Sequence, residues 1–75
     1  MSIGANIRKR RFELKLTQEE LAITMGYKTR STIAKIEQGK VDVSQGRVVQ
    51  FSQVLGVSIA WLMDWEEAEK KNDQL

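Results

Sequence analysis

Two short amphipathic segments, joined by little more than a turn, constrain the fold of this chain most strongly. The first follows Thr17, and the sequence TQEE predicts a capping box in which Thr17 and Glu20 each bind the other's backbone amide through a side-chain oxygen. Gly26 supplies the left-handed residue that commonly ends such a helix, and Thr29 is the expected N-cap of the second helix. Helices this short are not stable alone. They must therefore pack steeply on each other, with Ala22 as the small contact residue, inside a larger helical core.

The rest of the chain predicts three more helices and no strand. Apolar residues recur at helical spacing over residues 2–14, from the N-cap Ser44 to Gly56, and over residues 59–65 behind Ser58. Side chains expected to face the core, or to lie beside it, are Ile3, Ile7, Phe12, Leu14, Leu16, Leu21, Ala22, Met25, Ile33, Ile36, Val48, Phe51, Val54 and Leu55. The fold class is therefore all-α, a compact domain of five short helices.

The domain is expected to occupy residues 1–65. Residues 66–75, EEAEKKNDQL, are polar and indicate a tail or the start of a linker. Lys15 stands where the first helix must end, so it is expected in a left-handed or similar backbone conformation.

Composition excludes several classes of function. The chain has no Cys and no His, so a disulfide framework, a structural zinc site and the usual general base are not expected. An enzyme would have to use carboxylates, Lys or Ser, and their spacing indicates no active site, so neither catalysis nor a cofactor is expected. No apolar run is long enough to cross a membrane, and the N-terminus does not resemble a signal peptide. A cytoplasmic protein, in a bacterium or a phage-infected host cell, is expected.

Charge is distributed unevenly along the chain. Residues 1–47 carry ten basic and five acidic side chains, a net charge of +5, whereas residues 48–75 carry two and five, a net charge of −3. A basic half favours contact with a polyanion. Lopsided charge is also common in soluble domains by chance, so this pattern alone leaves nucleic-acid binding open.

The second of the two short helices carries the strongest functional signal. Once Ile33 and Ile36 face inward, the outer face is polar and cationic, with one small gap: Arg30, Ser31, Ala34, Lys35 and Gln38. Such a helix fits the major groove of B-DNA, where base edges offer donors and acceptors. The alternative is an ordinary solvated face.

The sequence as a whole resembles a known family. The motifs TQEELA, MG and STIAKIEQGK, followed by LGVS and WL, resemble the helix-turn-helix domain of the lambdoid phage repressor and Cro family, also called XRE-like, over residues 3 to about 65. The fuller pattern is most similar to the N-terminal domains of CI-like repressors from phages of Gram-positive bacteria. The resemblance implies a lambda-repressor-like fold that binds double-stranded DNA sequence-specifically and regulates transcription, with repression favoured. Residues 29–38 would enter the major groove of a near-palindromic operator.

The resemblance also implies roles for individual residues. Base contacts would come from Arg30, Ser31 and Lys35. Contacts with the DNA backbone, or from the turns, would come from Gln18, Lys28, Thr29, Thr32, Lys40, Ser44 and Arg47. Arg11 and Glu37 would form a structural ion pair that holds the recognition helix at its angle. The turn between Gly26 and Ile33 looks one residue longer than in the lambdoid repressors, which would let Lys28 reach DNA from the turn.

Assembly and the wider function remain open at this point. Trp61, Leu62 and Trp65 would either close the core or form a two-fold contact, and the resemblance implies a homodimer on DNA. A C-terminal dimerisation domain absent from this chain is also implied, although the chain could equally be a complete small regulator. A DNA-binding antitoxin and a restriction-modification controller protein are the alternative functions, because both use the same fold.

Overall fold

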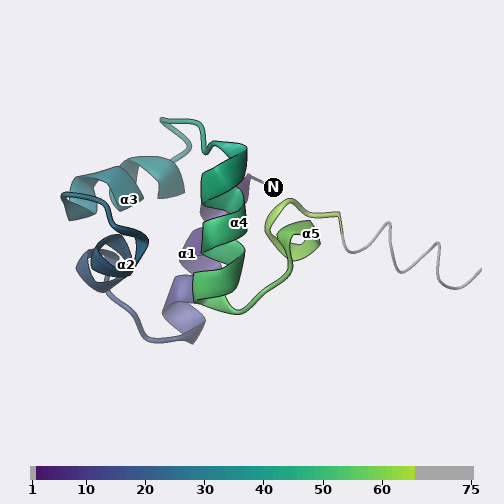
Figure 1. Ribbon diagram of the computed structural model, residues 1–75, viewed down its shortest axis with the longest axis horizontal. Helices are drawn as coiled ribbons and strands as arrows, with labels where there is room; N and C mark the ends of the chain where they lie inside the picture. The colour runs from purple at the N-terminus through teal and green to yellow at the C-terminus, as the bar shows by residue number, and fades with distance from the viewer. Residues whose placement is uncertain (1, 66–75) are drawn as a thin grey trace, which may run out of the picture.

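The structure, a computed structural model, describes residues 2–65 as five helices without a strand (Figure 1). The helices are α1 (Ile3–Glu13), α2 (Gln18–Met25), α3 (Arg30–Glu37), α4 (Gln45–Leu55) and α5 (Ile59–Leu62). The predicted all-α fold of five short helices is therefore confirmed. The tail or linker expected at residues 66–75 lies outside the described residues. Among residues 2–65, no helix has the length and apolar character needed to cross a membrane.

The starts of the helices follow local capping chemistry. Ser2, Thr17, Ser44 and Ser58 each accept a hydrogen bond from an amide in the first turn of the helix that follows. Thr17 also takes part in the predicted capping box with Glu20. Thr29 occupies the N-cap position of α3, as predicted, but its side chain makes no capping hydrogen bond.

The ends of all five helices share one geometry. A residue with positive φ follows each helix closely, and the next amide donates to the carbonyl five residues back. The five residues with positive φ are Lys15, Gly26, Gly39, Gly56 and Asp64. Lys15, with φ of 60°, has the left-handed conformation that was predicted. The helix expected over residues 59–65 is shorter, because the Trp65 amide closes it by donating to the Ala60 carbonyl at 2.7 Å.

The core is formed by side chains from every helix. Its buried members are Ile7, Leu21, Ala22, Met25, Ile33, Ile36, Val48, Phe51, Leu55 and Leu62. The predictions for Phe12 and Leu14 were wrong, because these side chains are 57% and 38% exposed. The buried stripe of α1 instead runs through Gly4, Ile7 and Arg11, at helical spacing. Two of these three residues are not apolar, so hydrophobic periodicity predicted Ile7 correctly but not the rest of the buried face of α1.

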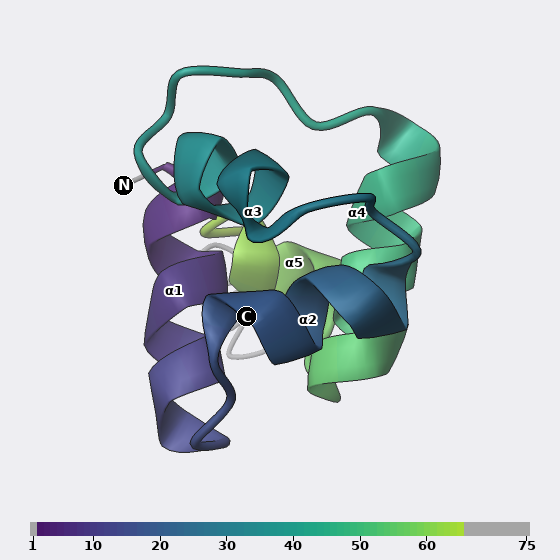
Figure 2. The ribbon, with the colours of Figure 1, turned by 90° about the vertical axis from the view of Figure 1, so that its left-hand side faces the viewer.

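The arrangement of the helices leaves α3 at an edge of the molecule. Figure 1 shows α2 and α3 at one end, α1 and α4 in the middle, and α5 at the opposite end. Figure 2 views the first of these ends, where α3 crosses α2 steeply. Ala22 is 2% exposed on the inner side of α2, as a steep crossing of this kind requires. One side of α3 therefore packs on the core while the other remains open.

Candidate nucleic-acid interface

The outer face of α3 is open and polar. Ile33 and Ile36 are 0% and 3% exposed on its inner side. On the outer side Arg30, Ser31, Lys35 and Gln38 are exposed and Ala34 is half-buried. The three residues predicted to contact bases, Arg30, Ser31 and Lys35, thus belong to one accessible surface. Such a surface can present several donors at once to the edges of base pairs.

The first turn of α3 adds to this character. Thr29 is exposed and does not cap the helix with its side chain, and Thr32 is half-buried in the first turn. The backbone amides at the start of a helix carry partial positive charge and have no helical carbonyl to bind. The start of α3 is therefore electrostatically suited to an anion, and the phosphate contacts of Thr29 and Thr32 stay a prediction.

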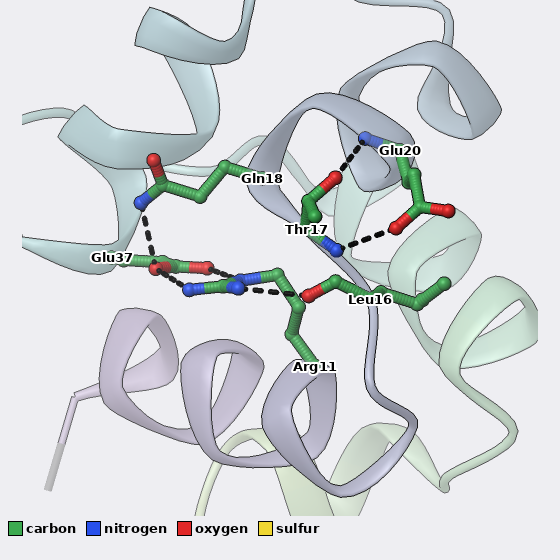
Figure 3. Close-up of polar contacts among 6 residues, drawn as sticks. All are labelled: Arg11, Leu16, Thr17, Gln18, Glu20 and Glu37. Atoms are coloured by element: carbon green, nitrogen blue, oxygen red, sulfur yellow. Dashed lines mark hydrogen bonds and ion pairs between the residues drawn. The ribbon is translucent and has the colours of Figure 1, made fainter.

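A buried ion pair fixes the position of α3 (Figure 3). The Arg11 guanidinium donates to both oxygens of the Glu37 carboxylate, with Nε to Oε2 at 2.7 Å and Nη2 to Oε1 at 3.0 Å. The two side chains are only 8% and 3% exposed. Arg11 Nη1 also donates to the carbonyl of Leu16 at 2.9 Å. We call this arrangement the Arg11–Glu37 clasp; it joins α1 and the turn that follows it to the last turn of α3.

Gln18 extends the clasp to α2. Its Nε2 donates to Glu37 Oε1 at 3.2 Å, so the Gln18 side chain binds the carboxylate of the clasp (Figure 3). The neighbouring capping box occupies the amides of Thr17 and Glu20. At the start of α2 the amides of Gln18 and Glu19 are not used by the capping box, and no helical carbonyl can reach them. The backbone amide of Gln18 is thus better placed than its side chain to bind a phosphate.

The remaining residues of the predicted backbone contacts lie in or near the turns. Lys28, in the turn before α3, and Lys40, in the loop after it, are exposed and present cationic groups at this edge of the molecule. Ser44 accepts a hydrogen bond from the Arg47 amide at 3.3 Å and so serves first as the cap of α4.

Arg47 has an internal role that the sequence did not reveal. Its Nη1 donates to the Met25 carbonyl and, at 2.9 Å, to Gln50 Oε1, and its guanidinium carbon lies 4.2 Å from the centre of the Tyr27 ring. The side chain is half-buried. Arg47 therefore satisfies the end of α2, where a helix presents unpaired carbonyls and partial negative charge.

Sequence reasoning also missed three residues of α1 that position other helices. Asn6 is 2% exposed, and its Nδ2 donates to the Leu62 carbonyl at 2.9 Å. Arg10 Nε donates to the Leu55 carbonyl at 2.8 Å. Gly4 lies against the backbone of Ile36. The one available signal was that polar and small residues occur at helical spacing on the face of α1 that carries Ile7.

The residues proposed for a two-fold contact separate into core and surface. Leu62 is 0% exposed and belongs to the core, so of the two alternatives left open the possible two-fold contact is wrong for this residue. Trp61 is half-buried, and Trp65 is 54% exposed. A mainly apolar groove of about 290 Å³ runs beside Trp65, between α4 and α5; its lining residues are Gln45, Val48, Val49, Ile59, Met63 and Trp65.

Comparison with known proteins places this geometry in a family. The fold is similar to that of the P22 c2 repressor protein, solved in complex with a synthetic operator, with a TM-score of 0.78 and 25% identity over 87% of this chain and 97% of that one. It is similar to the restriction-modification controller protein C.AhdI from Aeromonas hydrophila, with a TM-score of 0.74 and 28% identity over 81% and 91% of the two chains. The fold is also similar to that of the clp gene regulator ClgR from Corynebacterium glutamicum, with a TM-score of 0.74. The identity is 23%, and the match covers 96% of this chain and 83% of that one.

These similarities confirm that the five helices form a lambda-repressor-like fold. Comparison with curated proteins gives no match. The model of a family described as helix-turn-helix matches residues 7–62, most of the chain and all of α2 and α3. The chain therefore belongs to this helix-turn-helix family.

Proposed function

We propose that this protein is a sequence-specific regulator of transcription that binds double-stranded DNA by placing α3 in the major groove. The observation that carries the proposal is the position of α3 itself. Its apolar side is packed on the core, its polar and cationic side is open, and the Arg11–Glu37 clasp fixes it between α1 and α2. A helix held in this way can meet base edges without a further ordering cost.

The comparisons support this function at two points. The P22 c2 repressor protein was solved with a synthetic operator, and C.AhdI is a restriction-modification controller protein. Both resemble this chain across more than four-fifths of its length. Repression is the outcome we favour, since the resemblance to the phage repressor extends over 97% of that chain. A restriction-modification controller is the second candidate, favoured by the higher sequence identity to C.AhdI.

In this proposal the open face of α3 contacts the bases, and residues in and near the turns contact the DNA backbone. Arg30, Ser31 and Lys35 contact base edges, where one good bidentate pair contributes about 1–3 kcal/mol of discrimination. The other contacts reach phosphate and set the register of the protein on the duplex without carrying sequence information. These residues are Gln18, Lys28, Thr29, Thr32, Lys40, Ser44 and Arg47. The guanidinium of Arg47 also makes internal hydrogen bonds, which restrict its reach toward a phosphate.

The groove between α4 and α5 supports a homodimer. Val49, Ile59 and Trp65 are 42%, 37% and 54% exposed around it, which is apolar area that a second copy would cover. Because this groove lies on the α4–α5 side of the molecule, away from α2, pairing there leaves α3 open (Figure 1). A two-fold pair would then place its recognition helices about one turn of DNA, roughly 34–36 Å, apart on a near-palindromic site.

Selection of bound duplexes from a random pool tests the proposal, with the stoichiometry of the selected complex measured by sedimentation. We expect one enriched sequence with two inverted half-sites, bound by two chains. Enrichment of no sequence, with equal binding to all duplexes, would overturn sequence-specific recognition. An enriched site without symmetry, bound by a single chain, would support recognition by α3 and contradict the proposed homodimer.

A further inference from the structure

A polar cleft opens where α1, α2 and α3 meet. Its volume is about 200 Å³, and its lining residues are Arg8, Arg11, Gln18, Ala34, Glu37 and Gln38. Ala34 and Gln38 belong to the outer face of α3, so the cleft borders the surface that we propose to meet DNA. Gln18 and Glu37, which stand side by side in Figure 3, form its inner wall.

Arg8 supplies the accessible positive charge of this cleft. Arg11 and Glu37 neutralise each other inside the clasp and are nearly buried. Arg8 is exposed, and no carboxylate within residues 2–65 pairs with it. The cleft therefore has one cationic group that is available to a ligand, together with the side-chain amide of Gln38.

Phe12 helps to orient this cationic group. The guanidinium carbon of Arg8 lies 5.3 Å from the centre of the Phe12 ring, and that of Arg11 lies 4.5 Å from the same centre. The ring is 57% exposed and is not part of the core. Stacking of this kind favours a limited set of Arg8 orientations and leaves its N–H donors available. Phe12, which is exposed and lies outside the core, thus has a role in orienting Arg8.

The start of α2 offers backbone amides at the same place, beside the carboxylates of Glu19 and Glu20 in its first turn. Gln18 is the first residue of α2, and its backbone amide and that of Glu19 are left over by the capping box. Helix amides of this kind bind phosphate oxygens, particularly beside an Arg side chain.

We propose that Arg8 binds a phosphate of the DNA backbone at this cleft, which gives the interface a contact from α1. The inference rests on the proposed function and adds to it a residue outside the helix-turn-helix. Arg8 and Arg11 lie on the same helix, and Arg11 holds α3 through the clasp. The phosphate contact therefore ties the register of the DNA strand directly to the position of the recognition helix.

The matched control is Lys9, the next residue. Arg8→Ala and Lys9→Ala each remove one exposed positive charge from the same turn of α1. The Lys9 ammonium, however, lies 6.0 Å from the centre of the Trp61 ring of α5, and Lys9 is not among the residues that line the cleft. A long-range effect of net charge would weaken binding by both variants alike, whereas a local phosphate contact would separate them.

Titrations of the full chain against the selected duplex and a random duplex, over a range of salt concentrations, test the inference. We expect Arg8→Ala to lower affinity for both duplexes by the same factor and to reduce the slope of log K against log salt by about 0.9, the value for one phosphate contact. Lys9→Ala should retain the wild-type slope. Arg8→Lys should restore most of the slope, and Phe12→Ala should weaken binding less than Arg8→Ala does.

Equal slopes for Arg8→Ala and Lys9→Ala, with wild-type binding intact, would overturn this inference and leave the proposed function standing. Failure of the wild-type chain to bind any duplex would overturn both. Since Arg8 and Phe12 are exposed, thermal unfolding should show that all four variants fold.

Discussion

Gly4 in α1 lies in direct backbone contact with Ile36 in α3: a Cβ atom added at Gly4 would stand 2.0 Å from the Ile36 carbonyl oxygen. No side chain can occupy that position unless the two helices separate. The contact is between the first turn of α1 and the last turn of α3, next to the Arg11–Glu37 clasp. The position of the recognition helix therefore depends on a glycine that touches no DNA in our proposal.

We expect Gly4→Ala to lower the free energy of unfolding by about 1–3 kcal/mol, because the obstacle is backbone and cannot rotate away. Gly46→Ala is the matched control, since Gly46 holds the same second position in α4 and has no atom within 4 Å of an added Cβ. That change should leave stability unaltered or raise it by up to about 1 kcal/mol. Urea unfolding of both variants is the measurement, and equal effects would contradict the contact.

The clasp should be the most costly polar interaction to break. Glu37→Gln keeps the size of the side chain but leaves the buried Arg11 guanidinium without its counter-charge, so we expect a loss of about 3–5 kcal/mol in unfolding free energy. The pair of Arg10 and Glu13, at 3.3 Å, is the control, because its side chains are 29% and 46% exposed. Glu13→Gln should cost less than about 1 kcal/mol. Denaturant titrations that give the two variants similar stability would refute this role for the clasp.

Asn6 should hold α5 in place. Its Nδ2 donates to the carbonyls of Leu62 at 2.9 Å and Trp61 at 3.4 Å. The Trp61 carbonyl also accepts from the Asp64 amide at 3.3 Å, so Asn6→Ala should cost about 1–3 kcal/mol mainly by removing the donor to the buried Leu62 carbonyl. Asn6→Asp is nearly the same shape but brings an acceptor to those oxygens, and it should destabilise at least as much. Tryptophan fluorescence during unfolding, to which Trp61 and Trp65 both contribute, reports the change. An Asp variant as stable as wild type would show that this hydrogen bond does not anchor α5.

Arg47 and Lys40 should differ in what their removal affects. Arg47→Ala removes the donor that Arg47 provides to the end of α2, so stability should fall by about 1–2 kcal/mol, with Gln50 Nε2 still donating to the Met25 carbonyl at 3.1 Å. Lys40→Ala should change stability by less than about 0.5 kcal/mol, since the side chain is exposed. It should instead weaken binding to all duplexes alike and reduce the salt slope by about 0.9. Thermal unfolding and DNA titration of both variants would distinguish these roles, and a fully stable Arg47→Ala would contradict the internal one.

The parts of the fold that sequence could predict are those with local causes. The starts of α2, α4 and α5 follow from Thr17, Ser44 and Ser58, because an N-cap side chain binds an amide only two or three residues ahead. The left-handed residues Lys15 and Gly26 were predictable for the same reason, since the chain must turn directly after a helix. Asp64 was not, because nothing in its own sequence distinguishes it from a continuing helix.

Contacts between helices depend on where distant ends meet, and sequence does not show this. Asn6, Arg10 and Arg47 look like surface residues, yet each donates to a carbonyl at the end of another helix. Arg47 in particular was expected only at phosphate. The Arg11–Glu37 pair could be anticipated solely because the resemblance implied it. For Leu62 the same resemblance allowed both a core position and a two-fold contact, so sequence could not decide between them.

The most direct test of the recognition helix is to repeat the selection of random duplexes with Arg30→Ala and Lys35→Ala. Both side chains are exposed on α3, so the variants should fold and still bind through their phosphate contacts. We expect each variant to lose preference at one base pair of each half-site, at a different position for each residue, while the rest of the selected sequence is retained. If both variants select the wild-type sequence unchanged, the outer face of α3 does not contact the bases and the proposal is wrong.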